Sequence, residues 1–404
     1  YAFGDPLSPH HNHDASDHVY VIQKIIDSGS NDPRETLFTY QSSWYPLGFH
    51  SVASFLCLLS GNSNCVMLPW YLIFVVTGFS TIAIFLFTFE YFGKFRLAIL
   101  ASIVSILFFV FPYAPYGWGG WSQICGQVLI FFNLYLCRSF LQKRKKDIRD
   151  ILLLGIFITT IFYVHTTDFL TFVILAILTN VDLVFREKFW KLSSVIGYLA
   201  VVVFSTVNCI PGYLGGKIIL HLDYHRYSVA NFSFKNAINW LTDYYVTGNN
   251  AWLLLVLCVL GLFGFVIHFR KNYPQMFLLY VIIFLWSCLC VLLQFCDSVY
   301  RFVYPIYPWG TPERLFYSLA LFYSISVAFG FDYIIFRVKK TVDLIFIIII
   351  FVIIGWRYLY KNVNILKGQN FLYSSVTLND LEMFDFIDEN KMDGKILTNL
   401  KDDS

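Results

Sequence analysis

The segment that decides the fold class is IRDILLLGIFITTIFYVHTTDFLTFVILAILTNVDLVF, residues 148–185. It contains two apolar runs, 148–164 and 168–185, which are joined by the short turn HTTD. Each run is close to the roughly 20 residues that a helix needs to cross the hydrocarbon core of a bilayer. The basic clusters QKRKK (142–146) and REKFWK (186–191) flank the pair. This pattern predicts a helical hairpin that enters and leaves a membrane on the same side.

The rest of the chain has the same apolar character. Of its 404 residues, 57% are hydrophobic and 20% aromatic, whereas only 14% are charged. Ordinary globular domains have about 25% charged residues, and the mean hydropathy here is +0.62. We therefore predict an all-α polytopic membrane protein. The net charge of +3 is too small to indicate a nucleic-acid partner. The lack of a Gly-rich phosphate loop in the sequence argues against an enzyme that uses nucleotide sugars.

Apolar runs of spanning length recur along the chain and predict a bundle of about ten or eleven transmembrane helices within residues 66–360. The runs cover residues 66–91, 95–113, 121–141, 148–164, 168–185, 192–211, 251–269, 276–295, 315–336 and 341–360.

The basic loops predict the orientation of this bundle. Lys and Arg cluster at every second connection, and such clusters face the cytoplasm. The clusters are GKFR (93–96), QKRKK (142–146), REKFWK (186–191), FRK (269–271) and RVKK (337–340). The other connections then face outward from the plasma membrane. They are the region up to residue 65, residues 112–121, the HTTD turn, residues 212–250, residues 296–314 and the tail from 361.

Two segments of the N-terminal region are apolar but do not fit as spans. YPLGFHSVASFLCLL (45–59) is short, and counting it as a span would place the later basic loops outside. We interpret it as a re-entrant or interfacial helix. VYVIQKIIDSG (19–29) has one apolar face and predicts a helix lying on the membrane.

The predicted organisation has three parts. They are an outer loop with interfacial helices (1–65), the transmembrane bundle (66–360) and the start of an outer C-terminal domain (361–404). A further N-terminal segment is expected ahead of residue 1. Most cysteines lie inside apolar runs, Cys57 among them, and are interpreted as small buried side chains that do not indicate a compartment.

Ionisable residues concentrate in HHNHDASDHVY (10–20). Asp14 and His18 are four residues apart, so on a helix they share a side. A carboxylate beside an imidazole can act as a general base or hold a divalent cation. Asp14 and Asp17 are the candidate ligands for such an ion, Mg²⁺ or Mn²⁺. Alternatively, the segment is a solvated His-rich loop in which Asp14 caps a helix.

Further candidates for substrate binding lie on the same predicted side of the membrane. They are Tyr45, His50, His165, Arg301, Trp309, Glu313 and Arg314. Ionisable groups at membrane depth are costly and are functional by default. Four of them also have a structural alternative: His50 as a satisfied core histidine, Glu313 paired with Arg314, and Trp309 as part of an aromatic belt.

Several stretches, in this order, resemble the GT-C superfamily of polytopic glycosyltransferases, and most closely an uncharacterised bacterial family within it. They are DASDH (14–18) with VIQKIIDSGS (21–30), WYPLGFHSVASFL (44–56), FYVHTTDFL (162–170), YPWGTPERLFYSLALF (307–322) and the tail from Val376. The sequence departs from the family where His165 is followed by Thr166 instead of Pro, and the acidic pairs of other GT-C enzymes are not obviously present.

The resemblance implies a GT-C-like fold and a lipid-linked sugar phosphate, usually a polyprenyl phosphate, as the donor. The sugar would pass to a cell-envelope glycan or lipid on the outer face, as in polysaccharide biosynthesis. GT-C enzymes place an acidic residue of the first outer loop at the reaction centre, and by position Asp14 takes that role, with His18 beside it. The alternatives are a non-catalytic scaffold of the same fold, or a transporter of lipid or polysaccharide.

Overall fold

The computed structural model describes residues 13–31, 46–61, 68–108, 120–143, 146–184, 191–217, 274–303 and 312–337, together with positions 236, 352, 353, 356 and 360. Throughout these residues the regular elements are α-helices, which confirms the predicted fold class. Two predicted spans lie outside the described residues: 251–269 entirely, and 341–360 except for four positions. The tail 361–404 also lies outside them.

The helices begin and end close to the predicted boundaries. In chain order they are α1 (His13–Ser28), α3 (Gly48–Ser60), α4 (Leu68–Phe92), α5 (Phe95–Phe108), α7 (Trp121–Gln142), α8 (Ile148–Val164), α9 (Thr166–Val184), α10 (Leu192–Lys217), α13 (Pro274–Phe295), α14 (Asp297–Val303) and α15 (Pro312–Arg337). The hairpin predicted from residues 148–185 is formed by α8 and α9, and His165 ends α8 in an extended conformation.

Four of the described helices contain segments both long and apolar enough to cross a bilayer. These are Tyr71–Phe92, Trp121–Gln142, Thr166–Leu183 and Phe277–Phe295. The helices α3, α5 and α10 contain shorter apolar stretches. The chain is therefore a polytopic membrane protein. The total of ten or eleven spans stays a prediction, because it includes segments outside the described residues.

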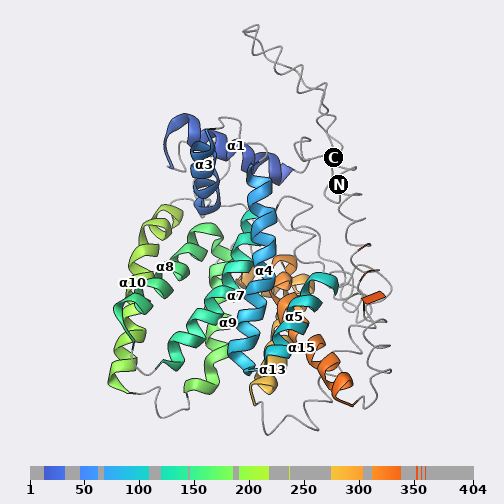
Figure 1. The fold of residues 1–404 in the computed structure, drawn as a ribbon. Coiled ribbons are helices and arrows are strands. Elements are labelled where there is room, and N and C mark those ends of the chain that lie inside the picture. The colour runs from blue at the N-terminus through green and yellow to red at the C-terminus, as the bar shows by residue number, and fades with distance from the viewer. Residues whose placement is uncertain are drawn as a thin grey trace.

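Contacts between helix termini lie at the end of the bundle that carries the described residues of the predicted basic loops. Arg96 at the start of α5 lies 2.8 Å from Asp332 near the end of α15. Lys146, just before α8, lies 3.4 Å from the hydroxyl of Ser194 at the start of α10. We call this end the basic end. The helices α1 and α3 cover the opposite end, at the top of Figure 1, which we call the hairpin end.

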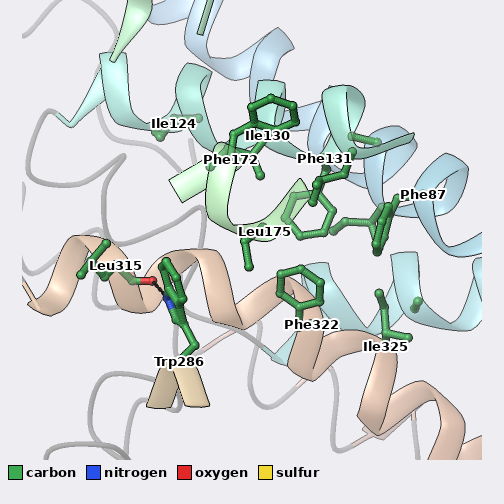
Figure 2. Close-up of a cluster of buried hydrophobic side chains, with 14 of the residues drawn as sticks. Phe87, Ile124, Ile130, Phe131, Phe172, Leu175, Trp286, Leu315, Phe322 and Ile325 are labelled. Atoms are coloured by element: carbon green, nitrogen blue, oxygen red, sulfur yellow. Dashed lines mark hydrogen bonds between the residues drawn. The ribbon is translucent and has the colours of Figure 1, made fainter. Parts of the chain in front are cut away.

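The core lies between α4, α7, α9, α13 and α15, and aromatic rings dominate it (Figure 2). Phe87 meets Phe131 and Phe322 edge to face, with ring centroids 5.5 and 6.0 Å apart. Trp286 donates a hydrogen bond to the carbonyl of Leu315 at 3.0 Å. In lipid the hydrophobic effect does not drive helices together, so this close packing supplies the association. Each aromatic pair contributes about 0.5–1.5 kcal/mol.

A charged pair that the sequence analysis did not single out is buried near the basic end. The guanidinium of Arg138 on α7 binds the Asp182 carboxylate on α9 through two hydrogen bonds of 2.6 and 2.9 Å. Its cationic carbon also lies 4.8 Å from the ring centre of Tyr91 on α4. The side chain of Arg138 is almost fully buried. This arrangement joins three helices through one cation.

Cys57 differs from its expected role as a simple buried thiol, because it is disulfide-bonded. The described cysteines on α7, α10 and α13 are free, as is Cys296 after α13. Disulfides persist in oxidising compartments and are rare in the cytosol. Cys57 lies on α3 at the hairpin end, and its oxidation therefore agrees with the predicted outward orientation of this end.

Candidate functional site

The helices α1 and α3 pack against each other across the hairpin end. The apolar stripe of α1, expected to lie on the membrane, instead contacts protein: Ile22 is fully buried and Ile25 nearly so. The Ser54 hydroxyl on α3 donates to the carbonyl of Ile22 at 3.2 Å. The other face of α3 exposes apolar side chains, among them Phe55 and Leu58. This helix, but not α1, therefore presents the apolar face of an interfacial helix.

A glycine allows α3 to begin directly against the end of α8. A β-carbon at Gly48 would lie 2.7 Å from the carbonyl oxygen of Tyr163 and 3.1 Å from the amide nitrogen of Val164. Both neighbours are backbone atoms and cannot rotate away. The next residue along α8 is His165, so this contact seats the α1–α3 pair beside the HTTD turn.

The two helices bring together His18 and His50, which are 32 residues apart in sequence. His18 Nδ1 lies 2.8 Å from His50 Nε2, and both side chains are buried. The His18 ring stacks on Trp121 at the start of α7, with centroids 5.6 Å apart and planes inclined by 23°. Phe49 meets both rings edge to face. The predicted candidates His18 and His50 thus form one cluster on the end of the bundle.

Burial in this cluster favours the neutral form of His50. Burial lowers the pKa of His50 well below its usual value, and the positive charge that His18 would carry lowers it further. In the close contact between the rings, one nitrogen carries the proton and the other accepts it. A neutral imidazole can accept a proton or donate a hydrogen bond, which is what acid–base chemistry requires.

Asp14 and Asp17 lie in the first turns of α1, and their side chains are outside the described part. The helical backbone places Asp14 one turn before His18, as the spacing predicted. Among the residues whose side chains are described, no group of three or more His, Cys, Asp or Glu is arranged to hold a metal ion. The metal-binding role of Asp14 and Asp17 therefore stays a prediction.

A second buried polar group lies at the turn between α8 and α9. His165 Nδ1 is 2.8 Å from Asp168 Oδ2, although the two atoms are not aligned for a hydrogen bond. The amide of Gln127 on α7 donates to the other oxygen of Asp168. A β-carbon at Gly126 would lie 2.1 Å from Asp168 Oδ2, so only glycine leaves room for this carboxylate. The side chains of His165 and Asp168 in the HTTD turn are both buried.

Three buried polar atoms in this group have no hydrogen-bond partner among the described residues. They are His165 Nδ1, Asp168 Oδ2 and Gln127 Oε1. Most buried polar atoms in proteins are satisfied, so an exception calls for an explanation such as a ligand, a water or a catalytic role. A carboxylate beside an imidazole can also orient that ring and stabilise it when protonated.

The remaining predicted binding residues are not brought into this cluster by the described contacts. Arg301 lies on α14, is largely exposed and pairs with Asp297 at 2.6 Å. Glu313 and Arg314 lie in the first turn of α15, but their side chains are outside the described part. Tyr45 and Trp309 also lie outside it. Their roles stay predictions.

Gln127 and Gly126 were not predicted to be part of a site. A signal was present, because Gln123 and Gln127 are one helical turn apart inside the apolar run 121–141. Two amides on one side of a spanning helix carry the same default functional interpretation as charges at membrane depth. Both side chains are buried, Gln123 at 1% exposure and Gln127 fully.

Comparison with known proteins identifies the family. A family model described as a family of unknown function, DUF6541, matches residues 1–344, which is most of the chain. The chain belongs to this family. No curated protein matches this DUF6541 member in sequence.

Solved structures with the same fold include an oligosaccharyltransferase from Archaeoglobus fulgidus. In its apo form it matches 95% of this chain with a TM-score of 0.59 at 12% sequence identity. In a form complexed with zinc and sulfate it matches 98%, with a TM-score of 0.53 at 15% identity. This chain covers 55% and 53% of those longer chains. The likeness confirms a GT-C-like fold for the DUF6541 chain, while its place in a bacterial family within GT-C stays a prediction.

Proposed function

We propose that this protein is an integral-membrane glycosyltransferase of the GT-C type. It would move a sugar from a polyprenyl-phosphate donor to a cell-envelope glycan or lipid at the outer face of the plasma membrane. The observation that carries the proposal is the pair His18 and His50, buried against Trp121 at the hairpin end. The helix α1 that supplies His18 also carries Asp14 one turn earlier.

Two further observations support this assignment. The fold is shared with an oligosaccharyltransferase, so the bundle is of a type that hosts sugar transfer in another protein. The disulfide at Cys57 agrees with an extracytoplasmic hairpin end, and the positive-inside rule assigns the basic end to the cytoplasm. The proposed site then faces the compartment in which an envelope acceptor is found.

The proposed reaction is substitution at the anomeric carbon of the donor sugar. Asp14 accepts the proton of an acceptor hydroxyl, whose oxygen forms a bond to the anomeric carbon. The bond from that carbon to the phosphate oxygen breaks, and polyprenyl phosphate leaves with the electron pair. His18, packed on Trp121 and held by His50, positions the general base and shares its proton.

The leaving phosphate requires positive charge and hydrogen-bond donors. Arg314 and Arg301 are proposed to bind it through their guanidinium groups, which match phosphate geometry. His50 and His165 are proposed as additional donors, and Glu313 as the group that orients Arg314. Tyr45 and Trp309 would stack on the sugar or the lipid chain.

A divalent cation is compatible with this site. Asp14 and Asp17 are three residues apart on α1, so their carboxylates share a side, and oxygen ligands suit Mg²⁺ or Mn²⁺. Bound there, the ion would neutralise charge on the donor phosphate. EDTA treatment of the purified protein, followed by Mn²⁺ titration with electron paramagnetic resonance, tests for this site without an activity assay. Loss of Mn²⁺ binding in Asp17→Asn is the expected result.

The function is tested by substituting Asp14 with Asn and measuring transfer of radiolabelled sugar from polyprenyl-phosphate donors in membranes. Loss of a general base lowers the rate by about 10²–10⁴-fold. Asp27→Asn is the matched control, because Asp27 lies on the same helix, is exposed and accepts a hydrogen bond from Gln23. Equal turnover of Asp14→Asn and wild type would remove Asp14 from the mechanism.

A non-catalytic scaffold is the second candidate, favoured by the fact that His18 and His50 bind each other. A deletion strain separates the two functions. An enzyme leaves its polyprenyl-phosphate sugar to accumulate in lipid extracts, and the Asp14→Asn gene fails to reverse that accumulation. A scaffold leaves the lipid pool unchanged, or is fully complemented by the variant.

A further inference from the structure

A groove of about 750 Å³ runs along the bundle between α9 and α10, with α8 and α7 as its floor. The helix α9 contributes residues spaced by three and four, among them Phe169, Phe172 and Ala176. The helix α10 contributes the same spacing, as in Tyr198, Val201 and Val202. Each helix therefore turns one whole apolar face toward the groove. Figure 1 shows α10 at the edge of the bundle beside α8.

The walls offer few free polar atoms to an occupant. The amide of Asn180 donates to the carbonyl of Ala176 at 2.8 Å, within its own helix. Ser205 reaches the carbonyl of Gly155 at 3.5 Å. These polar groups are hydrogen-bonded within the protein, so the remaining surface of the groove is apolar and can bind a hydrocarbon chain.

The mouth of the groove at the basic end carries a half-buried cation. The ammonium of Lys146 lies 4.7 Å from the ring centre of Tyr198 and 5.3 Å from that of Phe140, and both rings line the groove. It donates to the carbonyl of Lys143 at 3.1 Å and approaches Ser194 at 3.4 Å. An ammonium has three donors, and the described residues accept from two of them.

Among the described residues, the other charges near Lys146 leave this mouth positive. The ammonium of Lys143 is paired with the Asp150 carboxylate, and Asp147 caps α8 by accepting from the amide of residue 150. Lys191 lies one turn before Ser194 and is exposed. Burial lowers the pKa of Lys146, and the nearby Asp150 carboxylate opposes this effect only in part.

We propose that the groove binds one anionic glycerophospholipid of the leaflet at the basic end. Its phosphate would contact Lys146, and an acyl chain would extend between α9 and α10. Basic pockets between transmembrane helices on the cytoplasmic side are suited to anionic headgroups. This site lies at the end of the bundle opposite the histidine cluster and does not depend on the proposed transferase activity.

Size and charge favour a lipid over a helix as the occupant. A spanning helix about 30 Å long and 10–12 Å across fills roughly 2,400–3,400 Å³, several times the 750 Å³ of the groove. A volume of 750 Å³ lies within the range of ligand pockets. A helix would also leave the third donor of Lys146 without an anionic partner.

The test uses the full chain in nanodiscs of phosphatidylcholine with a minor fraction of phosphatidylglycerol, and native mass spectrometry counts the retained lipids. Val202→Trp fills the groove, whereas Val203→Trp is a matched control: both valines are 59% exposed, but only Val202 lines the groove. We expect one retained phosphatidylglycerol in wild type and Val203→Trp, and its loss in Val202→Trp. Equal retention in the two Trp variants would overturn the proposal.

Charge selectivity gives a second readout if Val202→Trp does not fold. Lys146→Gln should lower the preference for phosphatidylglycerol over phosphatidylcholine by about fivefold, since one cation near anionic lipid contributes about that factor. Lys24→Gln is the control, because Lys24 lies on α1 at the opposite end of the bundle. Retention of phosphatidylcholine and phosphatidylglycerol in equal amounts by wild type would overturn the assignment. So would displacement of the lipid by polyprenyl phosphate at equimolar concentration.

Discussion

At the basic end of the bundle, Arg138 and Asp182 bind each other through two hydrogen bonds, whereas at the hairpin end one oxygen of Asp168 has no hydrogen-bond partner among the described residues. The first pair uses its charges internally and joins three helices. The second group includes His165 and Gln127, each with a buried atom that is likewise unsatisfied. The charges at the basic end are thus paired within the protein, whereas the polar group at the hairpin end keeps buried atoms without a hydrogen bond among the described residues.

Breaking the basic-end pair should have the largest effect on stability. Arg138→Met leaves the Asp182 carboxylate without its partner at a site where Arg138 is almost fully buried, and we expect a loss of about 3 kcal/mol. Thermal unfolding in detergent, followed by tryptophan fluorescence, measures it.

The double variant Arg138→Met with Asp182→Leu should regain most of this loss, because no lone charge remains. The exposed pair of Lys143 and Asp150 is the control, and Lys143→Gln should change stability by less than about 1 kcal/mol. Equal losses in Arg138→Met and Lys143→Gln would contradict the distinction between the two pairs.

A methyl group at the hairpin end should have an intermediate effect on stability and a larger one on function. Gly126→Ala places a carbon 2.1 Å from the Asp168 carboxylate, which must move away from Gln127. We expect overpacking to cost about 1–3 kcal/mol. Gly78→Ala on α4 meets no atom within 4 Å and should be neutral or slightly stabilising. Similar sugar transfer by both variants would show that the position of Asp168 is unimportant.

Acid should loosen the hairpin end by the smallest amount. Since the pKa of His50 is lowered in the folded protein, the unfolded hairpin binds a proton below about pH 6.5 that the folded one excludes. Stability of the α1–α3 pair is therefore fully present above that pH. It falls as the pH decreases toward the folded pKa, by at most about 1.4 kcal/mol per pH unit.

Hydrogen exchange at pH 7.5 and 5.5, corrected for intrinsic rates, would show faster opening of α1 and α3 than of α7. His50→Gln should remove this pH dependence. Its persistence in that variant would assign the effect to another group.

Sequence alone could predict the features that depend on residues close together in the chain. The α8–α9 hairpin followed from two apolar runs and a polar turn, because bilayer thickness sets the length of such runs. The helical spacing of Asp14 and His18 could also be predicted, because it depends only on residues within one turn of a helix.

The features that were missed depend on contacts between distant parts of the chain. His18 and His50 were each identified as candidates, but their contact is set by the packing of α1 on α3. Gln127 and Asp168 are 41 residues apart, and hydrophobic periodicity does not predict which helices pack against each other. The role of Cys57 was wrongly interpreted because a thiol in an apolar run resembles any small buried side chain.

The shortness of α3 has a mechanical consequence. Its 13 residues extend about 20 Å, less than the roughly 30 Å of a hydrocarbon core, so a membrane would meet the exposed Phe55 and Leu58 in a single leaflet. A helix that displaces lipid from one leaflet alone makes the protein's footprint wider there than in the other. Lateral tension and spontaneous curvature of the host bilayer would therefore act on the seating of α3 and, through the hydrogen bond from Ser54 to Ile22, on α1, which carries His18.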